Sequence, residues 1–210
     1  MKPSAIRFAF QTARIGGCLI AGLVLISNSA RATSVIPPQF SELVGKSDYV
    51  VRAVVKSVSS ELRTSGPHRH ILTFVTLEVR EVIRGTPPQP LVLQMLGGKV
   101  GNDEMVIEGA PKFGVGDEDI LFVHGNGRQL NPLVALMHGR YPIKHEPGTG
   151  REYLTRSNGA LLLSEQDVAK PMTRPLTPAA LGTAPAMSPA DFSARIRAVP
   201  QTNHLPQLAN

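Results

Sequence analysis

The sequence predicts a mainly β protein: a small barrel of five strands, with a short helix before it and another helix after a proline-rich linker. Three observations support this fold class. Runs of β-branched residues recur along the middle of the chain, turn signals separate them, and long amphipathic helical patterns do not occur. The 19 glycines and 18 prolines among 210 residues favour many turns over long helices.

The first two strands carry the clearest patterns. Residues Tyr49–Val58 are dominated by valine and predict a strand in which Arg52 and Lys56 share a face. Residues Ile71–Ile83 alternate between apolar and polar side chains over a greater length, and the alternation is imperfect. That imperfection predicts a β-bulge, or a strand that bends around a barrel.

Three shorter strands follow. Leu91–Leu96 ends at a pair of glycines, and Ile120–Val123 is wholly apolar, which predicts burial on both faces. Residues 99–118 are expected to form a loop. Leu133–Met137 and Arg140–Ile143 supply the fifth strand, and Tyr153–Thr155 adds a hairpin strand. Five strands with a long, bent second strand fit a partly open barrel of the OB type.

Helices are expected only at the two ends of the domain. Phe40–Gly45 predicts one or two turns, and residues 33–165 form the barrel domain. A linker rich in Pro, Ala and Thr spans 166–188, and a frayed tail covers 200–210. Between them, Ser188 as N-cap and Pro189 as first residue start a helix over 189–199. Its apolar stripe either packs on the barrel or binds a partner as a tethered helix.

The first 32 residues have the pattern of a cleavable secretory signal. A basic stretch precedes the uncharged residues 15–26, and Ala30 and Ala32 form an A-x-A cleavage site before Thr33. The apolar run is shorter than the roughly 20 residues of a membrane-spanning helix, so we expect no permanent membrane anchor. The mature protein is therefore expected in the periplasm or outside the cell.

Removal of this segment changes the charge and the cysteine content. Lys2, Arg7, Arg14 and Arg31 lie in it, so 22 basic residues become 18 against 16 acidic ones, a balance of +2. No basic cluster remains, which argues against nucleic acid as a partner. The single cysteine, Cys18, leaves with the signal, so the mature chain forms no disulfide and uses no cysteine nucleophile.

Two sets of residues are candidate sites. His68 and His70 lie two apart on an extended segment, so both imidazoles project to one side, as a Zn²⁺ or Cu²⁺ site requires. A third ligand would come from a carboxylate or from another histidine (His124, His138 or His145). Arg140 and Tyr141 form a candidate interaction hot spot, since Arg and Tyr are enriched in such sites, although Tyr141 also fits strand packing.

Other motifs favour ordinary structural roles. Gly45-Lys46-Ser47 lacks the earlier glycine and the following helix of a P-loop. Asn102-Asp103-Glu104 and Asp117-Glu118-Asp119 are short acidic clusters that could bind calcium, but they lack EF-hand spacing and predict solvated turns. No serine has a G-x-S-x-G context and no H-E-x-x-H occurs, so we expect neither a hydrolase triad nor that type of zinc protease.

Several segments resemble a group of uncharacterised exported bacterial proteins with an OB-like barrel, themselves similar to the tissue inhibitors of metalloproteinases. The matching segments lie between about residues 40 and 156: 43–51, 76–85, 97–98, 109–118, 121–123 and 138–141. The resemblance implies a fold rather than an activity. Those inhibitors chelate zinc through an N-terminal cysteine, which the mature chain lacks, so protease binding would use another edge or loop.

Together these observations predict an exported, non-catalytic module that binds another protein, such as an exported enzyme and in particular a protease. We expect no cofactor, because no cofactor fingerprint is present in the sequence. The alternative is a periplasmic metal-binding protein that uses His68 and His70.

Overall fold

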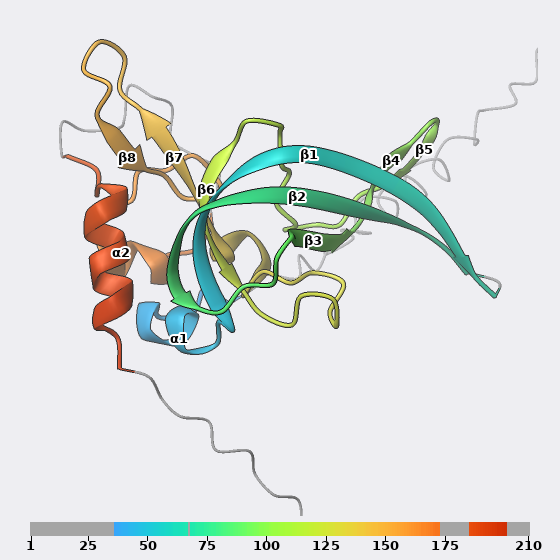
Figure 1. Ribbon diagram of the computed structural model, residues 1–210, viewed down its shortest axis with the longest axis horizontal. Helices are drawn as coiled ribbons and strands as arrows, with labels where there is room; N and C mark the ends of the chain where they lie inside the picture. The colour runs from blue at the N-terminus through green and yellow to red at the C-terminus, as the bar shows by residue number, and fades with distance from the viewer. Residues whose placement is uncertain (1–35, 67, 173–184, 201–210) are drawn as a thin grey trace, which may run out of the picture. The chain divides into compact units, whose positions relative to one another are not determined.

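The computed structural model describes residues 36–66, 68–172 and 185–200. These described residues fall in one compact unit in which most elements are strands (Figure 1). The mainly β prediction is therefore confirmed. The signal residues Ala30, Ala32 and Thr33, most of the predicted linker and the tail lie outside the described residues.

A six-stranded antiparallel sheet has the order β3-β2-β1-β6-β7-β8, and β4 and β5 form a separate hairpin. The strands are β1 (Tyr49–Ser65), β2 (His68–Gly85), β3 (Leu91–Leu96), β4 (Gly98–Val100), β5 (Asp103–Met105), β6 (Glu118–Val123), β7 (Arg140–His145) and β8 (Glu152–Leu154). The helices are α1 (Phe40–Gly45) and α2 (Pro189–Ala198), with 3-10 turns η1 (Leu136–Gly139) and η2 (Glu165–Ala169).

Strands β1 and β2 form a long curved ribbon that extends well beyond the other strands (Figure 1). Its register shifts three times, and the skipped residues are Ile83 and Arg80 in β2 and Lys56 in β1. The predicted bulge in the second long strand is thus confirmed. Each bulge reverses which face a following side chain takes, so Leu77 and Ile83 of the same strand enter different cores.

Strand pairing among the described residues does not close the sheet into a barrel, since β3 and β8 remain its edges. The segment after β6 nevertheless reaches β3. The N–H of Leu96 donates to the carbonyl of Leu130 at 2.6 Å, and the Asn126 amide donates to the carbonyl of Val92 at 2.9 Å. Leu133 forms only an isolated bridge with Val123, so the predicted strand material at 133–137 is wrong.

The hydrophobic core has two parts, one on each face of the sheet. The helix-covered cluster consists of Leu43, Val44, Val50, Ile83, Ile120, Phe122, Val134, Tyr141, Ile143, Leu154, Leu162, Val168, Met187, Phe192 and Ile196. The ribbon cluster consists of Tyr49, Val51, Ala53, Val55, Val75, Leu77, Leu91, Leu93, Met95, Leu121, Val123 and Leu133.

The C-terminal helix packs on the domain through its apolar stripe, so this stripe is not free to bind a partner. Ser188 Oγ accepts the Asp191 N–H at 3.1 Å and Pro189 begins the helix, as predicted. Phe192 is fully buried and its ring lies 5.0 Å from that of Tyr141 and 5.6 Å from that of Phe40. Val168 and Met187, inside the predicted linker, are also buried, so both ends of that segment belong to the fold.

Candidate functional site

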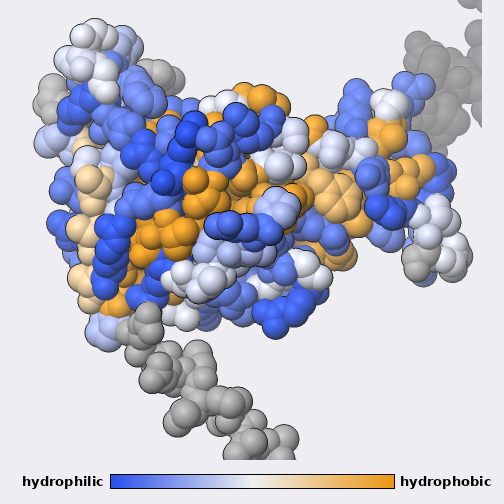
Figure 2. Space-filling view, in the orientation of Figure 1, coloured by the Kyte–Doolittle hydropathy of each residue, from blue (hydrophilic) through white to orange (hydrophobic). Residues whose placement is uncertain are grey.

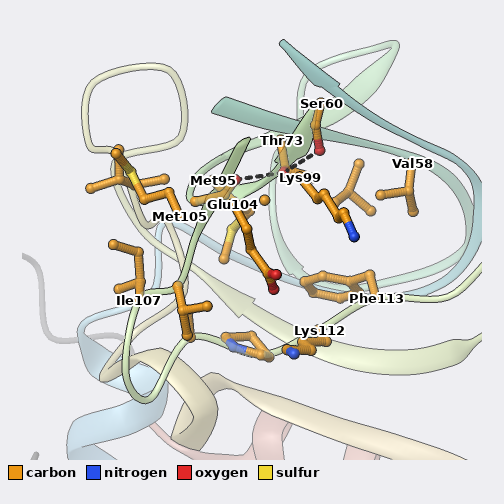
Figure 3. Close-up of a pocket in the computed structure, with 17 residues that line it drawn as sticks. Val58, Ser60, Thr73, Met95, Lys99, Glu104, Met105, Ile107, Lys112 and Phe113 are labelled. Atoms are coloured by element: carbon orange, nitrogen blue, oxygen red, sulfur yellow. Dashed lines mark hydrogen bonds between the residues drawn. The ribbon is translucent and has the colours of Figure 1, made fainter. Parts of the chain in front are cut away.

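The best candidate site is an apolar cleft of about 260 Å³ between the β1–β2 ribbon and the chain that follows β3. Figure 3 shows side chains from both sides directed into it. Its main apolar walls are Val58, Val75, Met95, Met105, Ile107 and Phe113. The volume suits one large apolar group, since it lies just below the usual range for small-molecule pockets.

Glycine allows the chain to cross this face of the ribbon closely. Ser60 and Thr73 are cross-strand partners, their hydroxyl oxygens lie 2.8 Å apart, and Thr73 donates to the carbonyl of Gly97 at 2.6 Å. A Cβ at Gly98 would lie 2.2 Å from Thr73 Oγ1, and its φ of +133° favours glycine. The β4–β5 hairpin, which was expected to be loop, starts at this crossing and forms one side of the cleft.

The opposite wall, residues 106–113, is held by contacts from β7 and from the turn before it. Arg140 lies over the ring of Phe113 at 4.4 Å and donates to the carbonyl of Lys112. The N–H of Met137 donates to the carbonyl of Gly109 at 3.1 Å. That turn contains Ala135 and Leu136, both with positive φ, a strained conformation for non-glycine residues that the surrounding contacts maintain.

Arg140 is fixed by two carboxylates. Its Nε donates to Asp119 at 2.8 Å and its Nη2 to Asp117 at 2.7 Å. Burial raises the pKa of Asp119, against the attraction of Arg140. Burial also opposes ionisation of Asp117, but the Gly114 N–H and the Arg140 guanidinium hold its pKa below the usual value.

This arrangement corrects two predictions. Arg140 is 7% exposed and Tyr141 is fully buried, so they do not form a surface hot spot. Arg140 instead positions the cleft wall, and Tyr141 packs in the helix-covered cluster. Asp119 was expected in a solvated turn but is fully buried in β6, where its ion pair with Arg140 offsets the cost of burial.

The polar groups of the cleft are few. Lys99, Glu104 and Lys112 line it, and in Figure 3 Lys99 and Glu104 extend from the hairpin in the direction of Phe113. Within the described parts of the chain, none of the three forms an ion pair. The two lysines against one glutamate give the apolar cleft a small net positive charge.

A second cluster lies at the other end of the sheet. Within the described residues, one group of three has metal-ligand chemistry: Glu118, His145 and Glu152, with ligand atoms within 4.8 Å of one another. However, Arg52 donates to Glu118 at 2.6 Å and to both oxygens of Glu152, at 3.1 and 2.7 Å. The guanidinium already occupies both carboxylates, offsets part of their charge and lowers the pKa of Glu152. The cluster is therefore an ion-pair network.

The predicted metal pair is placed at the far end of the ribbon. His68 is exposed and His70 is half-buried, opposite Ser65 and Arg63. Neither belongs to the metal-ligand group found among the described residues, so that part of the chain supplies no third ligand. Two of the candidate third ligands are engaged elsewhere, since His124 contacts Asp48 at 3.0 Å and His145 lies 3.4 Å from Glu152.

His138, the remaining candidate ligand, is buried with other polar groups. His138 Nδ1, Tyr141 Oη and Arg156 Nε have no hydrogen-bond partner among the described residues. Burial, aided by the nearby Arg156, lowers the pKa of His138 to about 4. Burial also lowers the pKa of Arg156 and raises that of Tyr141. This imidazole therefore stays neutral at neutral pH.

The sequence patterns did not predict the cleft, because its lining comes from five separate segments whose residues have no common motif. The one available signal was the pair Gly97-Gly98 after a strand, which was taken as a simple stop.

No protein-family model matches the chain, and no curated protein matches it. Among the described residues, no helix has the length and apolarity needed to cross a membrane.

Proposed function

We propose that this chain is an exported, non-catalytic module that binds another protein through the apolar cleft. The observation that carries the proposal is the cleft itself: apolar walls come from the ribbon and from residues 106–113, Arg140 contacts the second wall, and the chain crosses the ribbon closely at Gly98. Val106, at its opening, is 69% exposed. Exposed apolar surface beside a rigid concavity is typical of interaction sites.

The distribution of apolar residues over the surface also supports protein binding. Figure 2 shows apolar side chains along the middle of one face, with hydrophilic residues around them. A central apolar area with a polar rim is the usual arrangement of a protein interface. The partner class that follows from the resemblance is an exported enzyme such as a protease, so inhibition assays belong to the characterisation of any partner.

We also propose that the curved sheet and the segment after β6 together form a partly open, OB-like barrel. The hydrogen bonds from Leu96 to Leu130 and from Asn126 to Val92 support this, because they connect the ribbon end of the sheet with the end of β6. The resulting rigid frame would present the cleft on its outside.

Site-specific photo-cross-linking tests the proposal. The full chain, with a C-terminal tag, is produced in an exporting host with a photoreactive amino acid in place of Val106. The matched control carries it in place of Leu163, another exposed apolar residue, which lies before η2 and outside the cleft. We expect a discrete adduct with one partner protein at Val106 and none at Leu163.

Equal adducts at both positions, or none at either, would overturn the proposal. Fractionation of the same cells tests export, which predicts a product that begins at Thr33 outside the cytoplasm. A full-length product retained in the cytoplasm would contradict that part.

A further inference from the structure

One long edge of strand β1 is unpaired in the described structure. Strand β6 pairs with β1 only from Tyr49 to Val54, and one further exchange joins Val55 to the turn before β6. There the N–H of Val55 donates to Asp117 O at 2.8 Å and Gly116 N–H donates to Val55 O at 2.9 Å. Beyond this point, no backbone group of the described residues bonds to β1 on that side.

The register identifies which backbone groups are free. After the bulge at Lys56, Val58 pairs with Val75, Ser60 with Thr73 and Leu62 with Ile71. Counting from Val55, whose N–H and C=O point to β6, the alternation of an antiparallel ladder makes these the non-hydrogen-bonded pairs. The 2.8 Å contact between the hydroxyls of Ser60 and Thr73 agrees, because side chains approach closest in such pairs. Val58, Ser60 and Leu62 therefore direct their N–H and C=O groups away from β2.

The same edge borders the cleft. Val58 and Ser60 contribute side chains to its lining. A strand added beside β1 would lie about 4.8 Å away, with every second side chain on the cleft face. An unpaired row of N–H and C=O groups is complementary to extended main chain, and not to a helix.

The charges of the cleft indicate which side chains a bound segment would carry. Lys99 and Lys112 line it without an ion pair in the described residues, against the single carboxylate of Glu104. The uncompensated positive charge favours an acidic residue close to the apolar one.

We propose that the partner contributes an extended segment that pairs as an additional strand with β1 from Val58 to Leu62. One of its apolar side chains enters the cleft, and an acidic residue on the same face lies near Lys99 and Lys112. This inference rests on the proposed function and specifies the partner: an acidic, apolar peptide in β conformation.

The probe is a set of linear twelve-residue peptides displayed on phage and selected against the exported protein. The best peptide is then synthesised with single backbone N-methyl groups at successive positions, and each dissociation constant is measured. We expect N-methylation to weaken the affinity about tenfold at every second residue of the peptide and to change it little at the residues between, because only alternate N–H groups face β1. Uniform effects, a peptide that binds as a helix, or no selected peptide would overturn the inference.

A protein-side variant gives an independent readout. Leu62→Pro removes one outward N–H without removing a β1–β2 hydrogen bond, and Leu62 lies outside the cleft lining. We expect about tenfold weaker peptide binding for Leu62→Pro and nearly unchanged binding for the matched control Leu62→Ala. Equal binding by the two variants would contradict strand addition.

The outcomes separate the two proposals. A Val106 adduct without a peptide that shows alternation overturns strand pairing but leaves the cleft as a docking site for a folded protein surface. Loss of the Val106 adduct removes the proposed function itself.

Discussion

The two faces of the sheet are completed in different ways. On one face, α1 and α2 cover the core, and Phe192 packs against Phe40, Phe122 and Tyr141. On the other face, no helix covers the ribbon in the described structure, and the core continues into the cleft. The difference indicates that the helix-covered face is closed by its own elements, whereas the ribbon side is open to a ligand.

The ionic groups differ in the same way. Arg140, buried between Asp117 and Asp119, fixes a wall of the cleft, whereas most other ion pairs of the described residues are exposed. The comparison predicts that helix-side changes mainly alter stability. Changes at the cleft opening should instead alter binding alone.

The largest expected effect is on the helix-covered cluster. Phe192→Ala leaves a cavity among three aromatic rings, and we expect a loss of about 4 kcal/mol in the free energy of unfolding. Urea denaturation measures it, with exposed Val106→Ala as the matched control, expected within about 0.5 kcal/mol of wild type. Similar stabilities for the two variants would mean that α2 is dispensable.

Next is the buried ion pair. Arg140→Ala leaves Asp119 buried without its counter-charge, and we expect the free energy of unfolding to fall by about 3 kcal/mol. The control is Arg63→Ala, which removes only an exposed pair with Glu61 and should change stability by less than about 0.5 kcal/mol. A mild effect of Arg140→Ala would contradict the view that the burial of Asp119 depends on this ion pair.

Because of His138, we expect the free energy of unfolding to depend on pH by about 2 kcal/mol. Its pKa is about 4 when folded and near 6.5 when unfolded, so the unfolded chain binds the extra proton between these values. The neutral imidazole contributes fully to the free energy of unfolding above pH 6.5, and this contribution is lost as the pH falls towards 4. We expect about 2 kcal/mol of loss between pH 7.5 and 5. His138→Gln should lack this component in denaturation at both pH values, and an unchanged pH dependence would contradict a neutral buried imidazole.

The smallest expected change in stability is at the cleft opening. Val58 is 37% exposed, so Val58→Glu should change the free energy of unfolding by less than about 1 kcal/mol. The matched control is Val82→Glu, on the other long strand, at 45% exposure and outside the cleft. A large loss of stability for Val58→Glu alone would mean that this end of the ribbon is core rather than site.

Local patterns predicted the elements well. Leu91–Leu96 has the predicted limits because a glycine pair ends it, and the C-terminal helix begins at Pro189 as its Ser-Pro cap predicts, although it ends at Ala198, one residue before the predicted end. The apolar run at 133–137 was misread as a strand, since its positive-φ residues, Ala135 and Leu136, have no sequence signature. The site was not predictable in this way. Arg140 and Asp119 appeared as surface charges because their partnership depends on the pairing of β6 with β7.

The Val106 cross-link, measured in wild type and in Val58→Glu, tests the central claim most directly. If the cleft binds the partner, Val58→Glu will remove the Val106 adduct, because it places a carboxylate in the apolar wall. The melting temperature of this variant will stay within a few degrees of wild type. Val82→Glu will leave the adduct unchanged. An adduct of equal yield in Val58→Glu would contradict the account, because the partner would then bind without the cleft.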